Sequence, residues 1–282
     1  MQLTPGKGGL PRLLLTAADG ARAEIYQHGA HLTSWVPAGG VERLYLSGHA
    51  LFRPGTAIRG GVPVIFPQFA GEGPLPKHGF ARGLPWQLIA AAQPGQGPAS
   101  AIFRLEDSDA TRAVWPHAFR AELHIAVGGV AVETTLRVEN TGQSEISFTA
   151  ALHTYLRVAE IGAVRLRGLK GLHYRDTAQG GAGAVESADS LRIEGEVDRI
   201  YFNAPARLEL VDALGGLGIE SRSFADAVVW NPGAERAAAL SDLDAGGYRN
   251  FLCVEAANIG VPVRLASGAE WRGTQRLVQS GI

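Results

Sequence analysis

Residues 119–140, FRAELHIAVGGVAVETTLRVEN, alternate apolar and polar side chains over two stretches that are separated by Gly128 and Gly129. In the first stretch, every second residue from Phe119 to Val127 is apolar. Successive side chains of a β-strand point to opposite faces, so a period of two is typical of a strand with one buried face. These residues therefore predict two strands with a glycine turn between them.

The same pattern recurs along the chain and determines the predicted fold class. Further stretches rich in Val, Leu, Thr and aromatic residues are bounded by Gly, Pro, Asn and Asp, as strands usually are. The predicted strands are 23–36, 119–127, 130–140, 146–158, 207–213 and 271–279. One helix is predicted from Glu235 to Leu243, after the break at 231–233. The expected fold is all-β, a large and mostly antiparallel sandwich with few short helices.

The organisation of the chain favours a single domain over residues 1–282. Its 282 residues, 46% of them hydrophobic, are enough for one substantial core. No long linker or internal repeat divides it. The Gly- and Ala-rich segments 93–100 and 178–190 are predicted to be surface loops and not domain boundaries.

The net charge and the distribution of apolar residues limit the kinds of molecule that the protein is expected to bind. A net charge of −1 argues against a broad basic face for nucleic acid, because such binding depends on many phosphate contacts. The N-terminal residues contain only a short apolar patch, Leu13–Leu15, far below a signal-peptide core or a membrane span. We therefore expect a cytoplasmic monomer that binds neither nucleic acid nor membrane. The single cysteine, Cys253, lies in an apolar run and is expected to be a buried, inert thiol.

Several motifs that would indicate other chemistry are missing. The glycine-rich segments do not form a phosphate loop ending in Lys-Ser/Thr, and no Gly-x-Ser-x-Gly elbow supplies a serine nucleophile. His28 and His31 are close in sequence, but residues three apart on a strand point to opposite faces. They are interpreted as structural, and neither a metal site nor a cofactor is predicted.

A cluster of basic residues lies among glycines and prolines between residues 59 and 82. It consists of Arg59, Lys77, His78 and Arg82. A polar loop in a chain of almost no net charge does not need this cluster, whereas a site for a small anion does. The structural alternative is that one arginine pairs with Glu72 or Asp198.

Two ionisable residues lie in apolar surroundings, where burial is costly without a partner. They are His153, in 148–158, and Glu255, in 251–260. Taken separately, His153 is explained by a hydrogen bond to a backbone carbonyl, and Glu255 by an arginine at a strand end. Taken together, an imidazole and a carboxylate facing one pocket are suited to act as acid and base.

Seven segments, in this order, resemble the aldose 1-epimerase superfamily and, within it, the glucose-6-phosphate 1-epimerase branch. They are IRGGVPVIFPQFAG (58–71), PKHGFARGLPW (76–86), ALHTYLRV (151–158), VDRIYFN (197–203), VVWNPG (228–233), FLCVEAAN (251–258) and LASGAEWRGTQRL (265–277). The resemblance runs from about Gly29 to Gln275 and implies a galactose-mutarotase-like β-supersandwich. One departure is Ala256, which replaces the proline that usually follows the catalytic glutamate.

The resemblance also implies an activity without a cofactor: interconversion of the α and β anomers of hexose 6-phosphates, D-glucose 6-phosphate being the expected substrate. It implies Glu255 as the base at the anomeric hydroxyl and His153 as the acid at the ring oxygen. The implied phosphate ligands are Arg59, Lys77 and Arg82. Asp198 is expected to accept hydrogen bonds from sugar hydroxyls, and His78 to bind a hydroxyl or to order its loop.

Two other functions remain open at this point. One is a mutarotase for unphosphorylated aldoses, in which the basic cluster has no role in binding. The other is a noncatalytic carbohydrate-binding sandwich, in which Trp86, Trp115 and Trp230 supply stacking faces.

Overall fold

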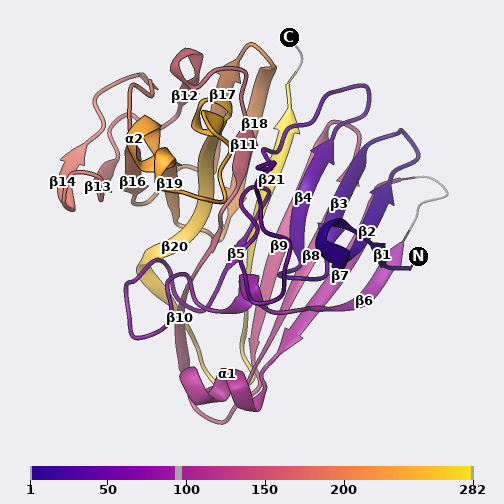
Figure 1. Ribbon diagram of the computed structural model, residues 1–282. Helices are drawn as coiled ribbons and strands as arrows, with labels where there is room; N and C mark the ends of the chain where they lie inside the picture. The colour runs from indigo at the N-terminus through magenta and orange to yellow at the C-terminus, as the bar shows by residue number, and fades with distance from the viewer. Residues whose placement is uncertain (1, 93–96, 281–282) are drawn as a thin grey trace.

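The computed structural model describes residues 2–92 and 97–280, and three antiparallel β-sheets form its framework (Figure 1). The two α-helices of the described chain are short: α1 (Asp109–Val114) and α2 (Gly233–Ala238). The 3₁₀ turns are η1 (Lys7–Gly9), η2 (Ala81–Gly83), η3 (Ile161–Ala163) and η4 (Gly247–Asn250). The predicted all-β, mostly antiparallel class is confirmed.

The sheets contain four, eight and nine strands. The four-stranded sheet has the order β1 (Thr4–Pro5), β2 (Pro11–Thr16), β3 (Arg22–Tyr26), β4 (His31–Val36). The eight-stranded sheet has the order β14 (Ala182–Val185), β13 (His173–Asp176), β16 (Val197–Tyr201), β19 (Asp226–Asn231), β20 (Phe251–Leu265), β10 (Ile146–Leu152), β5 (Val64–Ile65), and β11 (Tyr155–Arg157) also pairs with β20. The nine-stranded sheet has the order β15 (Ser190–Leu191), β12 (Arg165–Arg167), β17 (Arg207–Asp212), β18 (Gly215–Arg222), β21 (Glu270–Gln279), β9 (Ala131–Asn140), β8 (Phe119–Gly128), β7 (Ala99–Glu106), β6 (Gln87–Ala92).

The alternating stretch 119–140 forms β8 and β9, as predicted. The two strands pair from Phe119 opposite Asn140 to Gly128 opposite Ala131, and Gly129 turns the chain with a φ of 57°. The apolar residues of β8 face the main core, which contains side chains from all three sheets. The alternation thus reports one buried face of the nine-stranded sheet.

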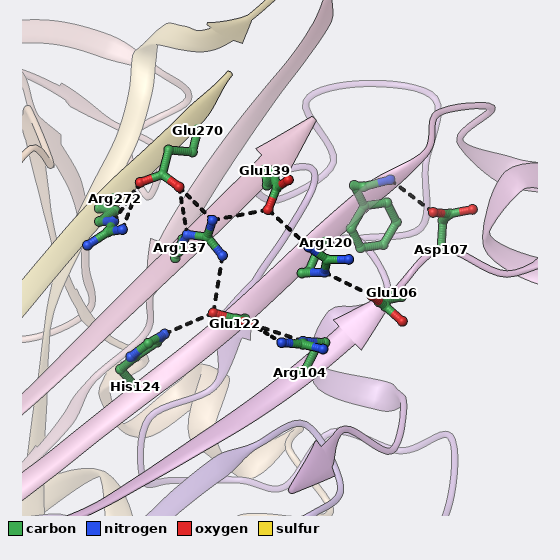
Figure 2. A network of polar contacts seen from close by, with 11 residues as sticks. Arg104, Glu106, Asp107, Arg120, Glu122, His124, Arg137, Glu139, Glu270 and Arg272 are labelled. Atoms are coloured by element: carbon green, nitrogen blue, oxygen red, sulfur yellow. Dashed lines mark hydrogen bonds and ion pairs between the residues drawn. The ribbon is translucent and has the colours of Figure 1, made fainter. Parts of the chain in front are cut away.

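The other face of this sheet carries a network of ion pairs across β7, β8, β9 and β21 (Figure 2). Register places Glu122 of β8 directly between Arg104 of β7 and Arg137 of β9. Arg104 donates to Glu122 at 2.7 Å, and Arg137 lies 3.2 Å from it. Opposite charges on neighbouring strands stabilise their pairing, so this face is polar and electrostatically balanced.

Strand β20 separates the main core from the face on which the candidate site lies. Alternate residues belong to the main core: Leu252, Val254 and Ala256. On the other face, Phe251 and Cys253 belong to one small apolar cluster, and Ala257 and Ile259 to another. Glu255 lies between these clusters, so a carboxylate is placed in a strand that is apolar on both faces.

Two predicted strands are interrupted. Residues 23–36 form β3 and β4, because Gly29 and Ala30 turn the chain with φ values of 72° and 46°. Residues 146–158 form β10 and β11, with a break at His153 and Thr154. Both interruptions were missed because each break is short and strand-like residues rich in apolar side chains lie on both sides of it.

The helix and loop predictions also need correction. Helix α2 ends at Ala238 instead of Leu243, because the backbone then tightens into bonds between residues three apart, such as Leu240 N–H to Ala237 O. The predicted loop 178–190 contains β14 and the first residue of β15. Of the predicted loop 93–100, residues 93–96 lie outside the described chain, and β7 begins at Ala99. Helix α1, which Ser108 caps, was not predicted.

Two composition-based expectations can be compared with the structure. Cys253 is fully buried, and burial raises the pKa of its thiol well above the usual value, as an inert cysteine requires. Within residues 2–92 and 97–280, no helix has the length and apolar character needed to cross a membrane.

Candidate active site

A pocket of about 420 Å³ lies on the face of the eight-stranded sheet that carries Glu255. All the residues that the sequence nominated line it: Arg59, Lys77, His78, Arg82, His153, Asp198 and Glu255. They come from segments spread over nearly 200 positions of the chain. The structure therefore brings together both nominated groups, the basic cluster and the ionisable pair.

Strand register places His153 beside Glu255. On β10, Ala151 pairs with Ala257, and on β11, Tyr155 pairs with Cys253. Continuing this register through the break puts His153 directly opposite Glu255. The His153 Nε2 and Glu255 Oε1 atoms are 3.3 Å apart, and no arginine forms an ion pair with Glu255 among the described residues. The strand-end explanation of Glu255 is therefore wrong, since Glu255 lies inside the 15-residue β20.

Both members of this pair are buried and have strongly shifted pKa values. Burial lowers the pKa of His153 well below its usual value, and His78, Arg82 and Arg59 add to the effect. Burial raises the pKa of Glu255 well above its usual value, and the nearby carboxylate of Asp198 adds to it. Buried ionisable groups whose pKa values move toward the neutral form, and which lie together in a cleft, are common at sites of proton transfer.

Aromatic rings hold the imidazole of His153 in place. The Tyr155 ring stacks on it at a centroid distance of 5.0 Å and an interplanar angle of 11°. Trp230 meets it edge-on at 5.8 Å. The Nδ1 atom of His153 and the Oε2 atom of Glu255 are buried without a hydrogen-bond partner among the described protein atoms. Such unsatisfied atoms are costly, and their presence in one pocket favours a functional role over a structural one.

Arg59 is held by a glycine turn and by two side chains. Gly60 and Gly61 follow it with φ values of 112° and 61°, and a Cβ on Gly60 would lie 2.4 Å from the Tyr45 carbonyl oxygen. Arg59 Nη2 lies 3.1 Å from the Asp242 carboxylate, and Nη1 donates to the Tyr155 hydroxyl at 3.1 Å.

The partner of Arg59 is therefore Asp242, and not Glu72 or Asp198 as the structural alternative supposed. Glu72 instead forms an ion pair with Arg175 of β13. A carboxylate thus offsets part of the charge of Arg59.

Lys77 and Arg82 are different, because neither forms an ion pair with a carboxylate in the described part of the chain. Arg82 lies in η2 and donates to the Lys77 carbonyl oxygen at 3.2 Å. Arg82 is partly buried and Lys77 is exposed at the pocket. Two cations without a counter-ion beside a buried pocket favour an anionic ligand.

His78 is held in one tautomer by its own loop. Its ring Nδ1 accepts from the Ala70 backbone N–H at 3.2 Å, and the backbone N–H of His78 donates to the Ala70 carbonyl oxygen at 2.8 Å. Its φ of 68° is unusual for a residue other than glycine. Burial, with help from Arg82 and Lys77, lowers the pKa of His78 to about 3. His78 is therefore neutral and carries its proton on Nε2, which makes it a hydrogen-bond donor.

Asp198 is the second carboxylate of the pocket. Across the sheet, Asp198 pairs with Trp230 and Ile200 with Val228, which in turn pairs with Glu255. Glu255 of β20, Val228 of β19 and Ile200 of β16 are thus aligned across the sheet. Asp198 lies two residues before Ile200, so its side chain is on the same face as that of Glu255. Burial raises its pKa.

Some pocket residues were not found from the sequence. Thr177 and Arg236 line the pocket, and Asp242 lies behind Arg59. Arg236 forms an ion pair with Glu196 at 2.6 Å. No local pattern marks these residues, because their roles depend on contacts between distant segments.

The remaining candidates from the sequence have structural roles or border the pocket. His28 Nε2 and His31 Nε2 each lie 2.7 Å from a backbone carbonyl, of Thr56 and Gly60 respectively. Trp86 and Trp115 are buried in the core, so Trp230 alone of the three tryptophans borders the pocket. Within the described ranges, no group of three or more His, Cys, Asp or Glu side chains is placed to hold a metal ion.

An adjacent imidazole and carboxylate in a cleft of a β-sandwich define an enzyme for acid–base chemistry on a small polar molecule. Residues 11–278 match the family model described as aldose 1-epimerase. The chain belongs to the aldose 1-epimerase family, and it is an enzyme of the epimerase and mutarotase class.

Similar proteins and a similar solved structure support this family membership. A protein of Cenchrus ciliaris named "Putative glucose-6-phosphate 1-epimerase" is 36% identical over 281 residues, which cover 96% of this chain and 85% of the relative. A protein of the same name from Escherichia coli K12 is 36% identical over 241 residues, 84% of this chain and 79% of the relative. A solved structure from Salmonella typhimurium, titled a "putative mutarotase", superposes with a TM-score of 0.88 at 31% identity and covers 96% of this chain and 91% of that one. The predicted galactose-mutarotase-like fold is thereby confirmed.

Proposed function

We propose that this protein interconverts the α and β anomers of hexose 6-phosphates and that D-glucose 6-phosphate is its substrate. One observation carries the proposal: the pocket that holds the His153–Glu255 pair also holds Lys77 and Arg82, two cations without a carboxylate partner among the described residues. The names of the relatives agree with this substrate. The enzyme is proposed to act as a monomer of one domain.

In the proposed reaction, Glu255 takes the proton of the anomeric hydroxyl while His153 gives a proton to the ring oxygen. The C1–O5 bond breaks with its electron pair moving to O5, and the C1=O1 double bond forms. Rotation about C1–C2 and the reverse transfers produce the other anomer. O1 and O5 are bonded to the same carbon, so the acid and the base must lie side by side, and a separation of 3.3 Å meets this need. Each positioned proton transfer supplies roughly 10²–10⁴ in rate.

The other nominated residues are proposed to position the sugar phosphate. Arg59 and Arg82 offer planar forks of donors to the phosphate, and Lys77 offers a point charge. His78 donates its Nε2 proton to a sugar hydroxyl, and Asp198 accepts from another. The phosphate and the sugar hydroxyls are thereby both held, which fixes the position of the anomeric carbon and lowers the entropic cost of the reaction.

Anomer exchange measured by NMR on D-glucose 6-phosphate, D-glucose and D-galactose tests the proposal. We expect kcat/KM to be highest for D-glucose 6-phosphate, with His153→Ala as the inactive control. Equal values for the three sugars would favour the mutarotase for unphosphorylated aldoses. Binding without any catalysed exchange would favour the noncatalytic sandwich.

A further inference from the structure

Tyr155 of β11 contacts two groups of the pocket that have different tasks in the proposed reaction. Its ring stacks on the imidazole of His153 at a centroid distance of 5.0 Å and an interplanar angle of 11°. Its hydroxyl accepts a hydrogen bond from Nη1 of Arg59 at 3.1 Å. His153 is one of the two proton-transfer groups, whereas Arg59 is a proposed phosphate ligand. A single side chain therefore contacts both the acid–base pair and the basic cluster.

The backbone joins the same three residues. The backbone N–H of His153 donates to the Pro63 carbonyl oxygen at 3.0 Å, and the backbone N–H of Tyr155 donates to the Gly61 carbonyl oxygen at 2.9 Å. Gly61 and Pro63 follow Arg59 closely in the chain. The turn that carries Arg59 therefore cannot shift relative to His153 without breaking these hydrogen bonds.

The ring of Tyr155 is itself fixed by other aromatic side chains. Phe251 lies at a centroid distance of 5.1 Å and Trp230 at 5.9 Å. Tyr155 is buried, and it belongs to the same apolar cluster as Phe251 and Cys253. Close packing of this kind holds a side chain in one rotamer. The hydroxyl is thus presented to Arg59 from a rigid support.

The hydroxyl completes the anchoring of the Arg59 guanidinium and leaves donors free for a ligand. Nε of Arg59 donates to the Asp242 carboxylate at 3.2 Å, and Nη1 donates to Tyr155. Contacts at two different nitrogen atoms fix the direction of the planar fork. A guanidinium has five N–H donors, so others remain for phosphate oxygens. Without the hydroxyl, the guanidinium can turn about its contact with Asp242.

We propose that Tyr155 is a positioning residue with two separable roles: its ring orients the imidazole of His153 for proton transfer with any aldose, and its hydroxyl orients Arg59 for the phosphate. The second role contributes to the selection of phosphorylated sugars. This second role rests on the proposed function, because it requires Arg59 to bind the phosphate. The first role requires only the acid–base pair.

Tyr155→Phe separates the two roles, because it removes the hydroxyl and keeps the ring. We expect kcat for the anomer exchange of D-glucose to be unchanged, since the stacking on His153 is retained. For D-glucose 6-phosphate we expect kcat/KM to fall about two- to tenfold, mainly through a higher KM. This is the effect of weakening a contact that holds the ground state and the transition state alike. NMR exchange rates measure both sugars, with circular dichroism to check folding.

Tyr155→Leu removes the ring as well as the hydroxyl. We expect it to lower kcat about tenfold or more on both sugars, because the imidazole of His153 loses its support. The matched control is Tyr201→Phe, which also removes a buried hydroxyl. Tyr201 lies in the main core, and its hydroxyl donates to Glu186 at 3.0 Å. This control should leave the exchange of both sugars unchanged per folded molecule.

Other results would overturn the inference. If Tyr155→Phe keeps the wild-type preference for D-glucose 6-phosphate over D-glucose, its hydroxyl has only a structural role. A stronger preference would mean that the hydroxyl competes with the phosphate for Arg59. An equal fall of kcat on both sugars in Tyr155→Phe, or an unchanged kcat in a folded Tyr155→Leu, would mean that the ring does not orient His153.

The same measurements separate this inference from the function on which it rests. If the wild-type enzyme does not prefer D-glucose 6-phosphate, the proposed function fails, and kcat on D-glucose still tests the role of the ring. If the wild-type enzyme has the preference and Tyr155→Phe retains it in full, only the inference fails. Tyr155→Phe decides the outcome even if Tyr155→Leu does not fold.

Discussion

Two histidine–glutamate pairs lie on different sheets of this molecule and have almost the same geometry. On the nine-stranded sheet, His124 Nε2 is 3.1 Å from Glu122 Oε2 (Figure 2). At the pocket, His153 Nε2 is 3.3 Å from Glu255 Oε1. The residue types and the distances do not distinguish the two pairs, so the surroundings must.

The surroundings act on the two carboxylates in opposite directions. Partial burial of Glu122 is outweighed by hydrogen bonds from Arg104 and His124, which lower its pKa. Among residues 2–92 and 97–280, no arginine donates a hydrogen bond to Glu255, and burial raises its pKa. A compensated pair on a surface stabilises a sheet, whereas an uncompensated pair in a pocket is available for proton transfer.

Substitutions in the two pairs should differ most in their effect on the rate of anomer exchange. We expect His153→Ala and Glu255→Gln each to slow anomer exchange by roughly 10²–10⁴, because each removes one positioned proton transfer. His124→Ala and Glu122→Gln should leave exchange per folded molecule unchanged. NMR exchange rates on D-glucose 6-phosphate, with circular dichroism to check folding, measure this. Near wild-type exchange in either pocket variant would contradict the proposed mechanism.

The uncompensated charge of the pocket can be tested with Arg82. We expect Arg82→Ala to lower kcat/KM for D-glucose 6-phosphate about ten- to a hundredfold more than for D-glucose, because only the phosphorylated sugar loses a charged hydrogen bond. Arg264→Ala, which removes an exposed arginine, is the control and should not change this ratio. An equal loss for both sugars would indicate that Arg82 has a structural role.

Replacing glutamate by glutamine should change the free energy of unfolding with opposite signs at Glu122 and at Glu255. The lowered pKa of Glu122 contributes stability that is present above its unfolded pKa of about 4.3 and is lost as the pH falls through the folded value. Glu122→Gln should therefore cost about 1–2 kcal/mol at pH 7.

The raised pKa of Glu255 has the reverse effect, because stability falls as the pH rises from about 4.3 toward the folded value. Glu255→Gln should be neutral or stabilising at pH 7. Denaturant unfolding of both variants at pH 4 and pH 7 measures the two effects. A large loss of stability in Glu255→Gln at pH 7 would mean that the carboxylate is compensated after all.

The smallest effect on the free energy of unfolding is expected for a substitution of His124. Its side chain is 39% exposed, and exposed ion pairs contribute roughly 0–1 kcal/mol. His124→Ala should thus change the free energy of unfolding by less than about 1 kcal/mol at pH 7. A loss of several kcal/mol would show that the surface network depends on this residue and would weaken the comparison of the two pairs.

The sequence predicted the strand content well because the alternation of side chains is local. The hairpin of 119–140 follows from its pattern, and so does the apolar run around Glu255. The breaks at Gly29 and His153 were missed, since each is short and strand-like residues rich in apolar side chains lie on both sides of it. The early end of α2 depends on how the chain packs after Ala238, which propensity does not report.

The sequence by itself determined which residue types are available for chemistry: a histidine and a glutamate in apolar strands, and basic residues among glycines. The tertiary structure alone decided which charges are paired. Arg59 is offset by Asp242, 183 residues away, while Lys77 and Arg82 have no carboxylate partner among the described residues. Only strand register put His153 opposite Glu255. Charge pairing and proton affinity depend on distance and burial in space, and neither is written in the local order of residues.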